Sequence, residues 1–251
     1  MKTFPFKGGI HPYDGKELSK DKPIKWVYPK GELIYPLSQH IGAPSVPVVK
    51  KGDCVLLGQK IAEAGSFVSA PIYSTVSGKV KTIEPRLTVT GAMINSIVIE
   101  NDFNYSEVEW PKRKPLEEMT REEKLEIIKE AGIVGMGGAG FPTHVKLSPK
   151  EPDKIEYIIA NCAECEPYLT SDYRRMMEDT EKIVGGLRIA VSLFKNARGI
   201  IAVEDNKADA IAKLREACKN DTNIEVVSLN TKYPQGAERI LIYACTGRKI
   251  N

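Results

Sequence analysis

Short apolar runs that alternate with turn residues fill the first part of the chain. Between residues 31 and 105 these runs are rich in β-branched residues, and turns at Lys51-Gly52-Asp53, Gly58-Gln59 and Ser77-Gly78 separate them. Runs of this length, bounded by such turns, predict β-strands. The predicted strands lie at residues 46–49, 54–57, 60–62, 74–76, 78–83 and 96–100. The pattern therefore predicts an all-β region.

Further along, strand-like runs alternate with runs of helical periodicity. Strands are predicted at residues 155–161, 199–203 and 224–229, and helices at 171–196, 207–218 and 236–245, the first with a break near Gly185-Gly186. Such alternation predicts a parallel sheet with helices on both faces. Ligands of these sheets bind beyond the carboxyl ends of the strands. We therefore expect the loops at residues 160–167, 204–206 and 230–238 to lie at one site.

These two patterns divide the chain into segments. Residues 1–30 are predicted to be an irregular arm, and residues 31–105 a β domain. Residues 106–118 are polar and contain prolines, which is typical of a linker between domains. The α/β domain is predicted to occupy residues 119–251.

A glycine-rich segment, residues 132–146, opens the α/β domain. Before it, residues 120–131 have apolar positions at helix spacing, and Thr120 and Glu123 are placed to form a capping box. The segment therefore joins a helix to a helix. The Rossmann fingerprint requires a preceding strand and the Walker motif requires a final Gly-Lys-Ser/Thr, so both motifs are excluded.

The residue types of this segment predict a phosphate-binding loop. Glycines permit positive φ and close approach of the backbone to a ligand, and consecutive N–H groups form anion-binding nests. Pro142 suits the first turn of a helix, whose N-terminus favours anions, and Lys146 adds a positive charge. A flexible linker is the alternative, but Phe141-Pro142 is stiff and a linker would contain more serine and charge.

Composition narrows the class of protein. The chain has 251 residues, of which 42% are hydrophobic and 27% charged, as in soluble globular proteins. Its net charge of +3 is too near neutral to indicate a nucleic-acid-binding protein. No apolar run approaches the roughly 20 residues of a membrane span, and no signal peptide opens the chain. The five mostly scattered cysteines favour reduced thiols in the cytoplasm.

Two further loops carry residues suited to ligand binding. Residues 161–168 read Asn-Cys-Ala-Glu-Cys-Glu-Pro-Tyr, and Cys162 and Cys165 have the spacing of half a zinc or iron–sulfur site, or of a redox dithiol. The remaining cysteines show no paired spacing, so we interpret this loop as a ligand contact and expect no metal. Residues 233–238, Tyr-Pro-Gln-Gly-Ala-Glu, place an aromatic ring and a carboxylate at the start of a helix, which suits a nucleotide.

Together these motifs resemble a known family. Gly137-Gly-Ala-Gly-Phe-Pro-Thr143 with Lys146, and the loops at residues 161–168 and 233–238, are similar to the flavin and nucleotide loops of the NADH-binding flavoprotein subunit of respiratory complex I. The resemblance to the RnfC family, a component of the Rnf electron-transport complex, is closer. It includes Gly8-Gly-Ile-His-Pro12 and extends the middle loop to Asp172.

The β region also takes part in this resemblance. Residues 49–61 and 74–80 resemble the two halves of a biotinyl/lipoyl-type barrel-sandwich hybrid. Carrier domains of that type have a cofactor lysine at the hairpin tip, but the matching residues 62–71 contain no lysine. We therefore interpret this domain as structural or docking. The expected fold class is α/β: a barrel-sandwich hybrid followed by a Rossmann-like domain with a parallel sheet.

The resemblance implies an activity. It implies a peripheral subunit on the cytoplasmic face of the cell membrane that binds FMN non-covalently and exchanges a hydride with NAD(H). Electrons pass singly through iron–sulfur clusters to or from ferredoxin, an indirect partner, and the complex translocates sodium ions or protons. Two [4Fe–4S] clusters are expected in a C-terminal region that this chain does not contain. The other partners are the remaining subunits of the membrane complex.

The resemblance also implies site residues. The FMN phosphate side would be held by Gly135, Gly137, Gly138, Ala139, Gly140 and Lys146, with Phe141 as a further cofactor contact. Asn161, Glu164 and Glu166 would lie near the flavin ring or ribityl chain. Tyr233, Gly236 and Glu238 would contact the nicotinamide nucleotide. No residue is assigned a catalytic role, because the cofactor performs the redox chemistry.

The sequence departs from the complex I pattern at three positions. Met136 replaces an arginine, and Cys165 and Tyr168 replace glycines; these variants suit the Rnf branch. One alternative is a non-catalytic adaptor that docks electron carriers without flavin, which the intact glycines and Lys146 disfavour. A flavoprotein reductase that serves another soluble enzyme system is a second alternative.

Overall fold

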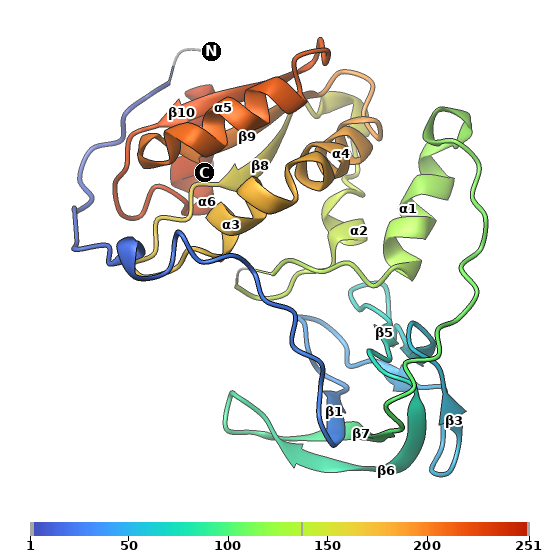
Figure 1. Ribbon diagram of the computed structural model, residues 1–251. Coiled ribbons are helices and arrows are strands. Elements are labelled where there is room, and N and C mark those ends of the chain that lie inside the picture. The colour runs from blue at the N-terminus through green and yellow to red at the C-terminus, as the bar shows by residue number, and fades with distance from the viewer. Residues whose placement is uncertain (1–2, 137, 250–251) are drawn as a thin grey trace. The chain divides into compact units, whose positions relative to one another are not determined.

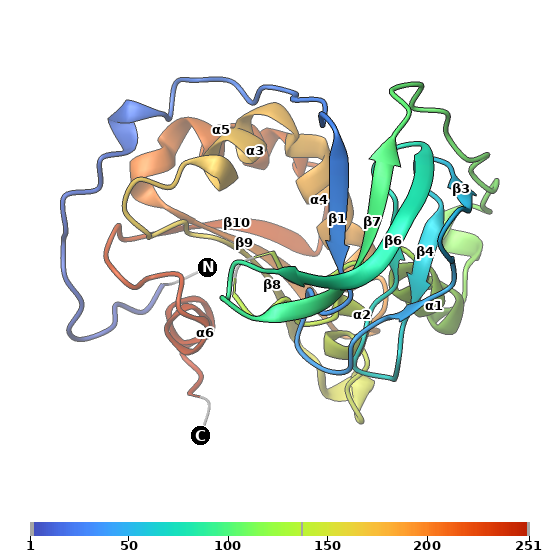
Figure 2. The same cartoon turned by 90° about the horizontal axis from the view of Figure 1, so that it is seen from below.

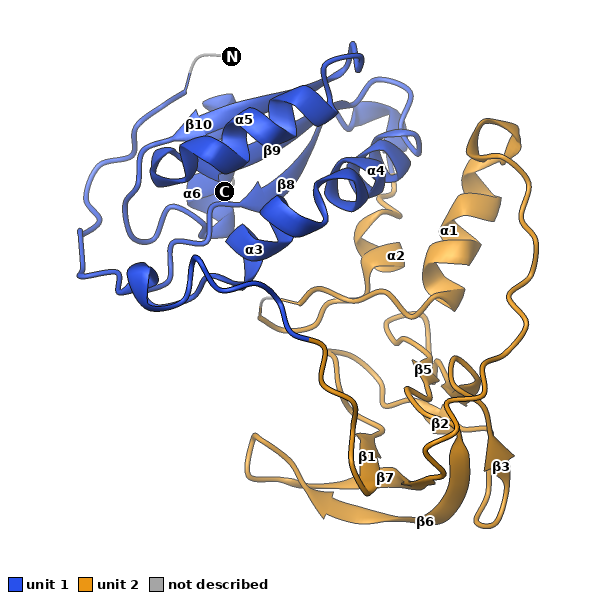
Figure 3. Ribbon diagram, viewed as in Figure 1, with its two compact units in different colours: residues 1–25, 151–251 blue, residues 26–150 orange. Residues whose placement is uncertain are grey.

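The structure is a computed structural model that describes residues 3–136 and 138–249 (Figure 1). It divides into two compact units (Figure 3). The first unit contains residues 1–25 and 151–251, and the second contains residues 26–150. This division differs from the predicted domain boundaries because residues 119–150 bond to the β region. The Tyr73 hydroxyl donates to the Glu130 carbonyl, and the Ile41 N–H donates to the Ala139 carbonyl.

The second unit is built on two antiparallel sheets. One has the strand order β1 (Glu32–Pro36), β7 (Met93–Asn101), β6 (Gly78–Leu87) and β3 (Cys54–Val55). The other has the order β2 (Val46–Pro47), β4 (Lys60–Glu63) and β5 (Ile72–Tyr73). Alternating side chains of these strands fill one core, in which Ile61, Val80, Ile97 and Ile99 are at most 1% exposed. The predicted all-β region is confirmed.

Two details of the β region differ from the prediction. Strand β1 is an additional strand, which pairs with β7 over five residues and buries Tyr35. The strand predicted at residues 74–76 is wrong, because β5 lies at Ile72–Tyr73 instead. The Ser74 backbone still bonds to Gly58 and Gln59, and its hydroxyl donates to the Val76 carbonyl at 2.6 Å, a local bond that favours a bend after Ser74.

The helices of the second unit flank the glycine-rich segment. A 3-10 turn, η2 (Leu116–Glu118), precedes α1 (Arg121–Glu130). The predicted capping box of α1 is present: the Glu123 N–H donates to the Thr120 hydroxyl at 3.2 Å, and the Thr120 N–H donates to the Glu123 carboxylate at 2.7 Å. Helix α2 (Thr143–Lys146) has only four residues, and Pro142 is its N-cap, one position before the first turn.

The first unit contains the predicted parallel sheet, with the order β10 (Ile224–Leu229), β9 (Arg198–Glu204) and β8 (Tyr157–Cys162). Helices α3 (Ser171–Glu178), α4 (Thr180–Val191) and α5 (Ala208–Ala217) pack on one face, and α6 (Glu238–Thr246) packs on the other (Figure 2). Ile201 and Val203 of β9 face the first group, whereas Ile200 and Ala202 face α6. The predicted α/β fold with both sheet faces covered is confirmed.

One helix break was predicted at the wrong place. The chain breaks at Asp179, where φ is −125° and ψ is 33°, and Gly185-Gly186 lie inside α4. Glycine costs about 1 kcal/mol in a helix relative to alanine. Burial of the neighbouring Val184 and Leu187 against the sheet outweighs that cost.

The remaining segments are short or irregular. They include the 3-10 turns η1 (Lys16–Leu18), η3 (Pro152–Lys154) and η4 (Asp205–Lys207). The N-terminal segment runs along the first unit, where the Phe4 N–H donates to the Ala244 carbonyl and Ile10 pairs with Tyr233. Among the described helices, none combines the length and the apolar composition that crossing a membrane requires.

Candidate functional site

The glycine loop, residues 132–143, turns back on itself between α1 and α2 (Figure 1). Val134 and Pro142 form an antiparallel bridge. The Gly135 N–H donates to the Phe141 carbonyl at 3.0 Å, and the Thr143 N–H donates to the Ile133 carbonyl at 2.9 Å. These bonds close the neck of the loop and leave its tip exposed. The Gly135 N–H is used in the neck, so Gly135 shapes the loop and offers no donor.

The tip of the glycine loop offers backbone donors. Within the described part of the chain, no group accepts a hydrogen bond from the N–H of Gly138, Ala139 or Gly140. Gly138 has φ 117° and Gly140 has φ 62°, a region that glycine adopts without strain. Exposed N–H groups on such a backbone bind anions, so these residues fit a phosphate. Gly137, a predicted member of the same loop, lies outside the described residues.

Two further predicted side chains, those of Phe141 and Lys146, follow the tip in sequence. Lys146 is exposed at the end of α2, and no acidic partner of its ammonium group is present among residues 3–136 and 138–249. Because α2 is a single turn, its dipole is small, and the full charge of Lys146 is the larger positive charge that this segment can offer to an anion. The Phe141 ring is 38% exposed and is available for stacking.

In the first unit, the acidic loop, residues 161–170, follows β8 directly. The Asn161 side-chain amide donates to the Gly236 carbonyl at 2.8 Å, and its oxygen accepts the Ala163 N–H at 3.3 Å. The Gly236 N–H in turn donates to the Cys165 thiol at 3.2 Å. The predicted residues Asn161 and Gly236 are therefore in direct contact.

The two predicted glutamates of this loop differ in environment. Glu164 is buried, and its Oε1 accepts the N–H groups of Asp172 and Tyr173, at 2.7 and 3.2 Å, at the start of α3. Burial raises the pKa of Glu164, and its Oε2 has no hydrogen-bond partner among the described residues, although Lys16 Nζ lies 3.8 Å away. Glu166 is exposed. Of the two carboxylates, only that of Glu166 faces solvent, where a ligand can reach it.

The third loop, residues 230–238, follows β10. Tyr233 precedes a cis peptide bond to Pro234 and is half-buried. Gln235 is 3% exposed, and its side-chain nitrogen lacks a partner within the described residues. Glu238 is exposed at the first residue of α6.

A buried ion pair joins the three loops at the ends of the strands. Lys207 Nζ donates to the Ala163 carbonyl at 2.8 Å and lies 3.3 Å from Glu204 Oε2. Glu204 Oε1 accepts the Lys232 N–H at 3.2 Å. Both side chains are at most 3% exposed, and burial raises the pKa of Glu204 and lowers that of Lys207. The expectation that these three loops meet is confirmed.

Sequence reasoning missed the buried charges. The Glu204 and Lys207 pair was detectable, because Glu204 ends the strand whose preceding residues, Ile200 to Val203, are apolar, and Lys207 stands three positions later. Lys16 had no such signal: it lies in the irregular N-terminal segment and contacts the acidic loop across 148 positions. The predicted site residues thus form two groups. Those of the acidic and third loops meet in the first unit, and those of the glycine loop lie in the second.

The two cysteines of the acidic loop have different surroundings. Cys162 is part of the core under α3 to α5, and burial raises its pKa to about 12. Cys165 is half-buried against Gly236. Metals bind the thiolate, which burial disfavours at Cys162. No group of three or more His, Cys, Asp or Glu side chains in the described ranges is placed to hold a metal. That this chain binds no metal stays a prediction, which metal analysis of purified protein checks.

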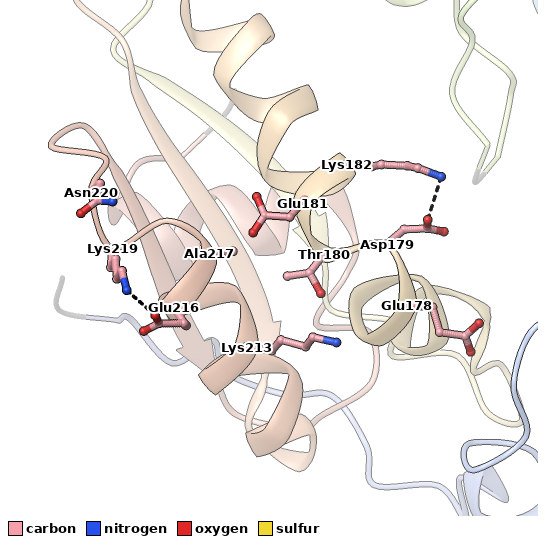
Figure 4. A pocket seen from close by; sticks show the side chains of 10 residues that line it. All are labelled: Glu178, Asp179, Thr180, Glu181, Lys182, Lys213, Glu216, Ala217, Lys219 and Asn220. Atoms are coloured by element: carbon pink, nitrogen blue, oxygen red, sulfur yellow. Dashed lines mark hydrogen bonds and ion pairs between the residues drawn. The ribbon is translucent and has the colours of Figure 1, made fainter.

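A surface hollow of about 610 Å³ lies elsewhere in the first unit (Figure 4). It is bordered by the α3–α4 junction and the end of α5. Two of its three lysines are paired, Lys182 with Asp179 and Lys219 with Glu216, and Lys213 Nζ donates to the Met177 carbonyl. None of the predicted site residues lines it. The hollow therefore contributes nothing to the candidate site.

Two protein families match different parts of this chain. Residues 128–251 match the family described as the Nuo51 FMN-binding domain, so the α/β region is an FMN-binding domain of the complex I type. Residues 4–104 match the RnfC barrel sandwich hybrid domain. The RnfC barrel sandwich hybrid domain thus comes first in the chain and the FMN-binding domain second. The chain belongs to the RnfC family, as the sequence resemblance predicted.

Individual relatives agree with this assignment. The chain is 47% identical to the C subunit of the Na⁺-translocating ferredoxin:NAD⁺ oxidoreductase complex of Acetobacterium woodii, over 100% of this chain and 57% of the relative. It is 46% identical to the C subunit of the proton-translocating complex of Clostridium ljungdahlii, over 98% of this chain and 54% of the relative. The chain thus spans about half the length of the curated relatives it matches.

Proposed function

We propose that this chain is the FMN- and NAD(H)-binding part of the RnfC subunit in an ion-translocating ferredoxin:NAD⁺ oxidoreductase. The observation that carries the proposal is the set of N–H groups at Gly138–Gly140 that have no acceptor among the described residues, followed by Lys146, an exposed cation without an acidic partner among the same residues. This donor set suits the phosphate of FMN. Membership of the RnfC family and the names of the two relatives support the same activity.

FMN, when bound, would supply the redox chemistry, namely hydride exchange with NAD(H) and transfer of single electrons. The residues of the chain bind and orient the reactants. The glycine loop would hold the phosphate through its backbone, with Lys146 as a charge-assisted donor. Asn161 and Glu166 would contact the ring or ribityl chain. Glu164 would orient the acidic loop, because its carboxylate accepts hydrogen bonds from the first N–H groups of α3.

The third loop would bind the nicotinamide nucleotide. Tyr233 offers an aromatic surface, and Glu238 offers an acceptor for ribose hydroxyls. Gly236 brings the third loop close to the acidic loop: a Cβ at this position would lie 3.3 Å from the Cys165 sulfur. That contact is tight, so the glycine permits the two loops to meet.

The setting of the chain is part of the same proposal. It would act as a peripheral subunit on the cytoplasmic face of the membrane, with the other subunits as direct partners and ferredoxin as an indirect one. The two [4Fe–4S] clusters stay a prediction about sequence outside residues 1–251. The coupling ion is open, because one named relative translocates Na⁺ and the other protons.

Titration of the purified chain with FMN and with riboflavin tests the proposal. Following flavin fluorescence, we expect FMN to bind at least tenfold more tightly than riboflavin, because only FMN has a phosphate for the glycine loop. Equal affinity would remove the phosphate argument. If neither flavin binds, the chain is better explained as a non-catalytic adaptor.

A further inference from the structure

Lys16 is a buried cation that holds the acidic loop from the opposite end of the sequence. Its Nζ donates to the carbonyl oxygens of Glu164, Glu166 and Leu169, at 2.9, 3.0 and 2.6 Å. An ammonium group has three N–H donors, so all three are used. The Glu164 carboxylate lies 3.8 Å away and balances the charge. Lys16 therefore fixes three backbone carbonyls of one loop.

The residues around Lys16 form a strap, residues 13–20, that covers the acidic loop. The Tyr168 N–H donates to the Asp14 carbonyl at 2.5 Å, and the Ser19 and Thr170 hydroxyls bond at 2.8 Å. Gly15 has φ 57°, and a Cβ there would lie 2.3 Å from the Tyr168 ring. Gly15 thus lets the strap lie directly on Tyr168.

The backbone held by the strap is strained. Glu164 has φ 51° and Tyr168 has φ 65°, a left-handed region that is unfavourable for a non-glycine residue. Tyr168 occupies a position where the complex I pattern has glycine, the residue that adopts this conformation freely. Strained residues persist only where their surroundings over-determine them. Here the three carbonyl bonds of Lys16 supply that constraint.

We propose that Lys16 is a positioning residue for the cofactor site. It acts as an internal cation that fixes the acidic loop, and the loop in turn presents Asn161 and the exposed carboxylate of Glu166. Lys16 holds the Glu166 carbonyl from within while the Glu166 side chain stays in solvent. This inference rests on the proposed function, because the loop is taken to contact the flavin.

The variant Lys16→Ala, with chemical rescue, tests this role. Hydrogen exchange is measured for the amides of residues 163–170, and affinity is measured for FMN and riboflavin. We expect exchange in the loop to become at least tenfold faster and both flavins to bind at least tenfold more weakly. The ratio of the FMN and riboflavin affinities should stay unchanged, because the phosphate end belongs to the glycine loop.

Added amines then separate positioning from simple loss of structure. Propylammonium matches the atoms from Cγ to Nζ that Lys16→Ala removes and supplies N–H donors, so it should restore both slow exchange and flavin affinity. Tetramethylammonium carries the same charge without N–H donors and should restore neither. The control Lys20→Ala removes a strap lysine that is 47% exposed and paired with Asp21 at the surface, and it should behave as wild type.

A second pair of variants covers the case in which Lys16→Ala does not fold. Lys16→Met keeps the apolar stem and removes the donors, whereas Lys16→Arg keeps charge and donors. Weak flavin binding by the Met variant with affinity retained in the Arg variant supports the role. Equal binding by wild type and Lys16→Met, or equal loss in both variants, overturns it.

The outcome also separates this inference from the proposed function. If wild type binds neither flavin, the proposed function fails, whatever Lys16 does. If wild type binds FMN and Lys16→Ala binds it equally well, the proposed function stands and the positioning role is wrong.

Discussion

The glycine loop and the acidic loop carry most of the predicted site residues, and they are built in opposite ways. The glycine loop has exposed backbone donors at its tip. The tip also accepts one hydrogen bond from outside the loop, from the Ile41 N–H to the Ala139 carbonyl. The backbone of the acidic loop is fixed by two buried lysines, Lys16 and Lys207, whose ammonium groups donate hydrogen bonds to its carbonyl oxygens. The glycine loop offers backbone donors at its tip, whereas the acidic loop has four carbonyl oxygens, those of Ala163, Glu164, Glu166 and Leu169, bound by buried lysines.

This difference shows where each loop gets its shape. The glycine loop takes much of its conformation from its own residue types, since Gly138 and Gly140 adopt positive φ without strain. The acidic loop has non-glycine residues at positive φ and depends on side chains 44 and 148 positions away. Changes at the glycine loop should therefore reduce binding, whereas changes under the acidic loop should first reduce stability.

The largest expected effect is on stability and comes from Lys207→Met. This change leaves Glu204, which is 1% exposed, as a buried carboxylate without its cation. Removing one partner of a buried ion pair costs about 3–5 kcal/mol. Urea unfolding should show this loss of unfolding free energy. The control Lys219→Met breaks a surface pair with Glu216 and should cost about 0.5 kcal/mol or less. A loss of unfolding free energy below about 1 kcal/mol for Lys207→Met would show that the Lys207–Glu204 pair does not stabilise the acidic loop.

The next effect is on binding and comes from Gly138→Val. Gly138 has φ 117°, which a β-branched residue does not adopt, although a Cβ there would meet nothing within 4 Å. Fluorescence titration should show no measurable FMN binding by a folded protein. Gly91→Val is the matched control, since Gly91 has φ 81° and equally open space in the β6–β7 turn. Unchanged FMN affinity in Gly138→Val would show that the loop is misassigned.

A smaller effect is expected for Lys146→Ala. If Lys146 makes a charge-assisted contact with the phosphate, its loss should weaken FMN binding by about 1–3 kcal/mol and leave riboflavin binding unchanged. Calorimetric titration with both flavins measures the difference. Lys150→Ala, which removes another exposed lysine of the second unit, serves as the control. Equal weakening for riboflavin would place Lys146 away from the phosphate.

The smallest effect concerns pH and the start of α3. The Tyr173 hydroxyl donates to Asp209 at 2.5 Å, and this bond raises the pKa of Tyr173 to about 12. Unfolded tyrosine ionises near pH 10, so the stabilisation is complete below about pH 10 and is lost as pH rises to about 12. The difference in unfolding free energy between wild type and Tyr173→Phe should disappear over that range. The difference between the tyrosine absorbance titrations of wild type and Tyr173→Phe reports the ionisation of Tyr173. A midpoint at about pH 10 in that difference, the value of unfolded tyrosine, would contradict the bond.

Local sequence signals predicted a large part of the fold. Thr120 and Glu123 identified the start of α1, and alternating apolar runs identified all three strands of the parallel sheet. The rule that ligands bind beyond strand ends then predicted that three loops meet. These features depend on residues close in sequence, or on a general property of parallel sheets.

Features that depend on distant packing could not be predicted in this way. The break at Asp179 and the continuity of α4 through Gly185-Gly186 are decided by contacts with the sheet. Strand β5 ends at Tyr73, and the bond from the Ser74 hydroxyl to the Val76 carbonyl just after it is one that the apolar pattern does not show. Lys16 is the clearest case, because nothing near it in sequence indicates a buried cation.

The bonds between Lys16 and the acidic loop also have a consequence for synthesis. The two partners are 148 to 153 positions apart, so the strap leaves the ribosome long before its acceptors exist. At about 5–20 residues per second, the wait is about 8–30 s. During that time the second unit, which is continuous in sequence, has been translated completely, whereas the first awaits its C-terminal part. The strap is therefore among the first segments made and among the last to reach its native contacts.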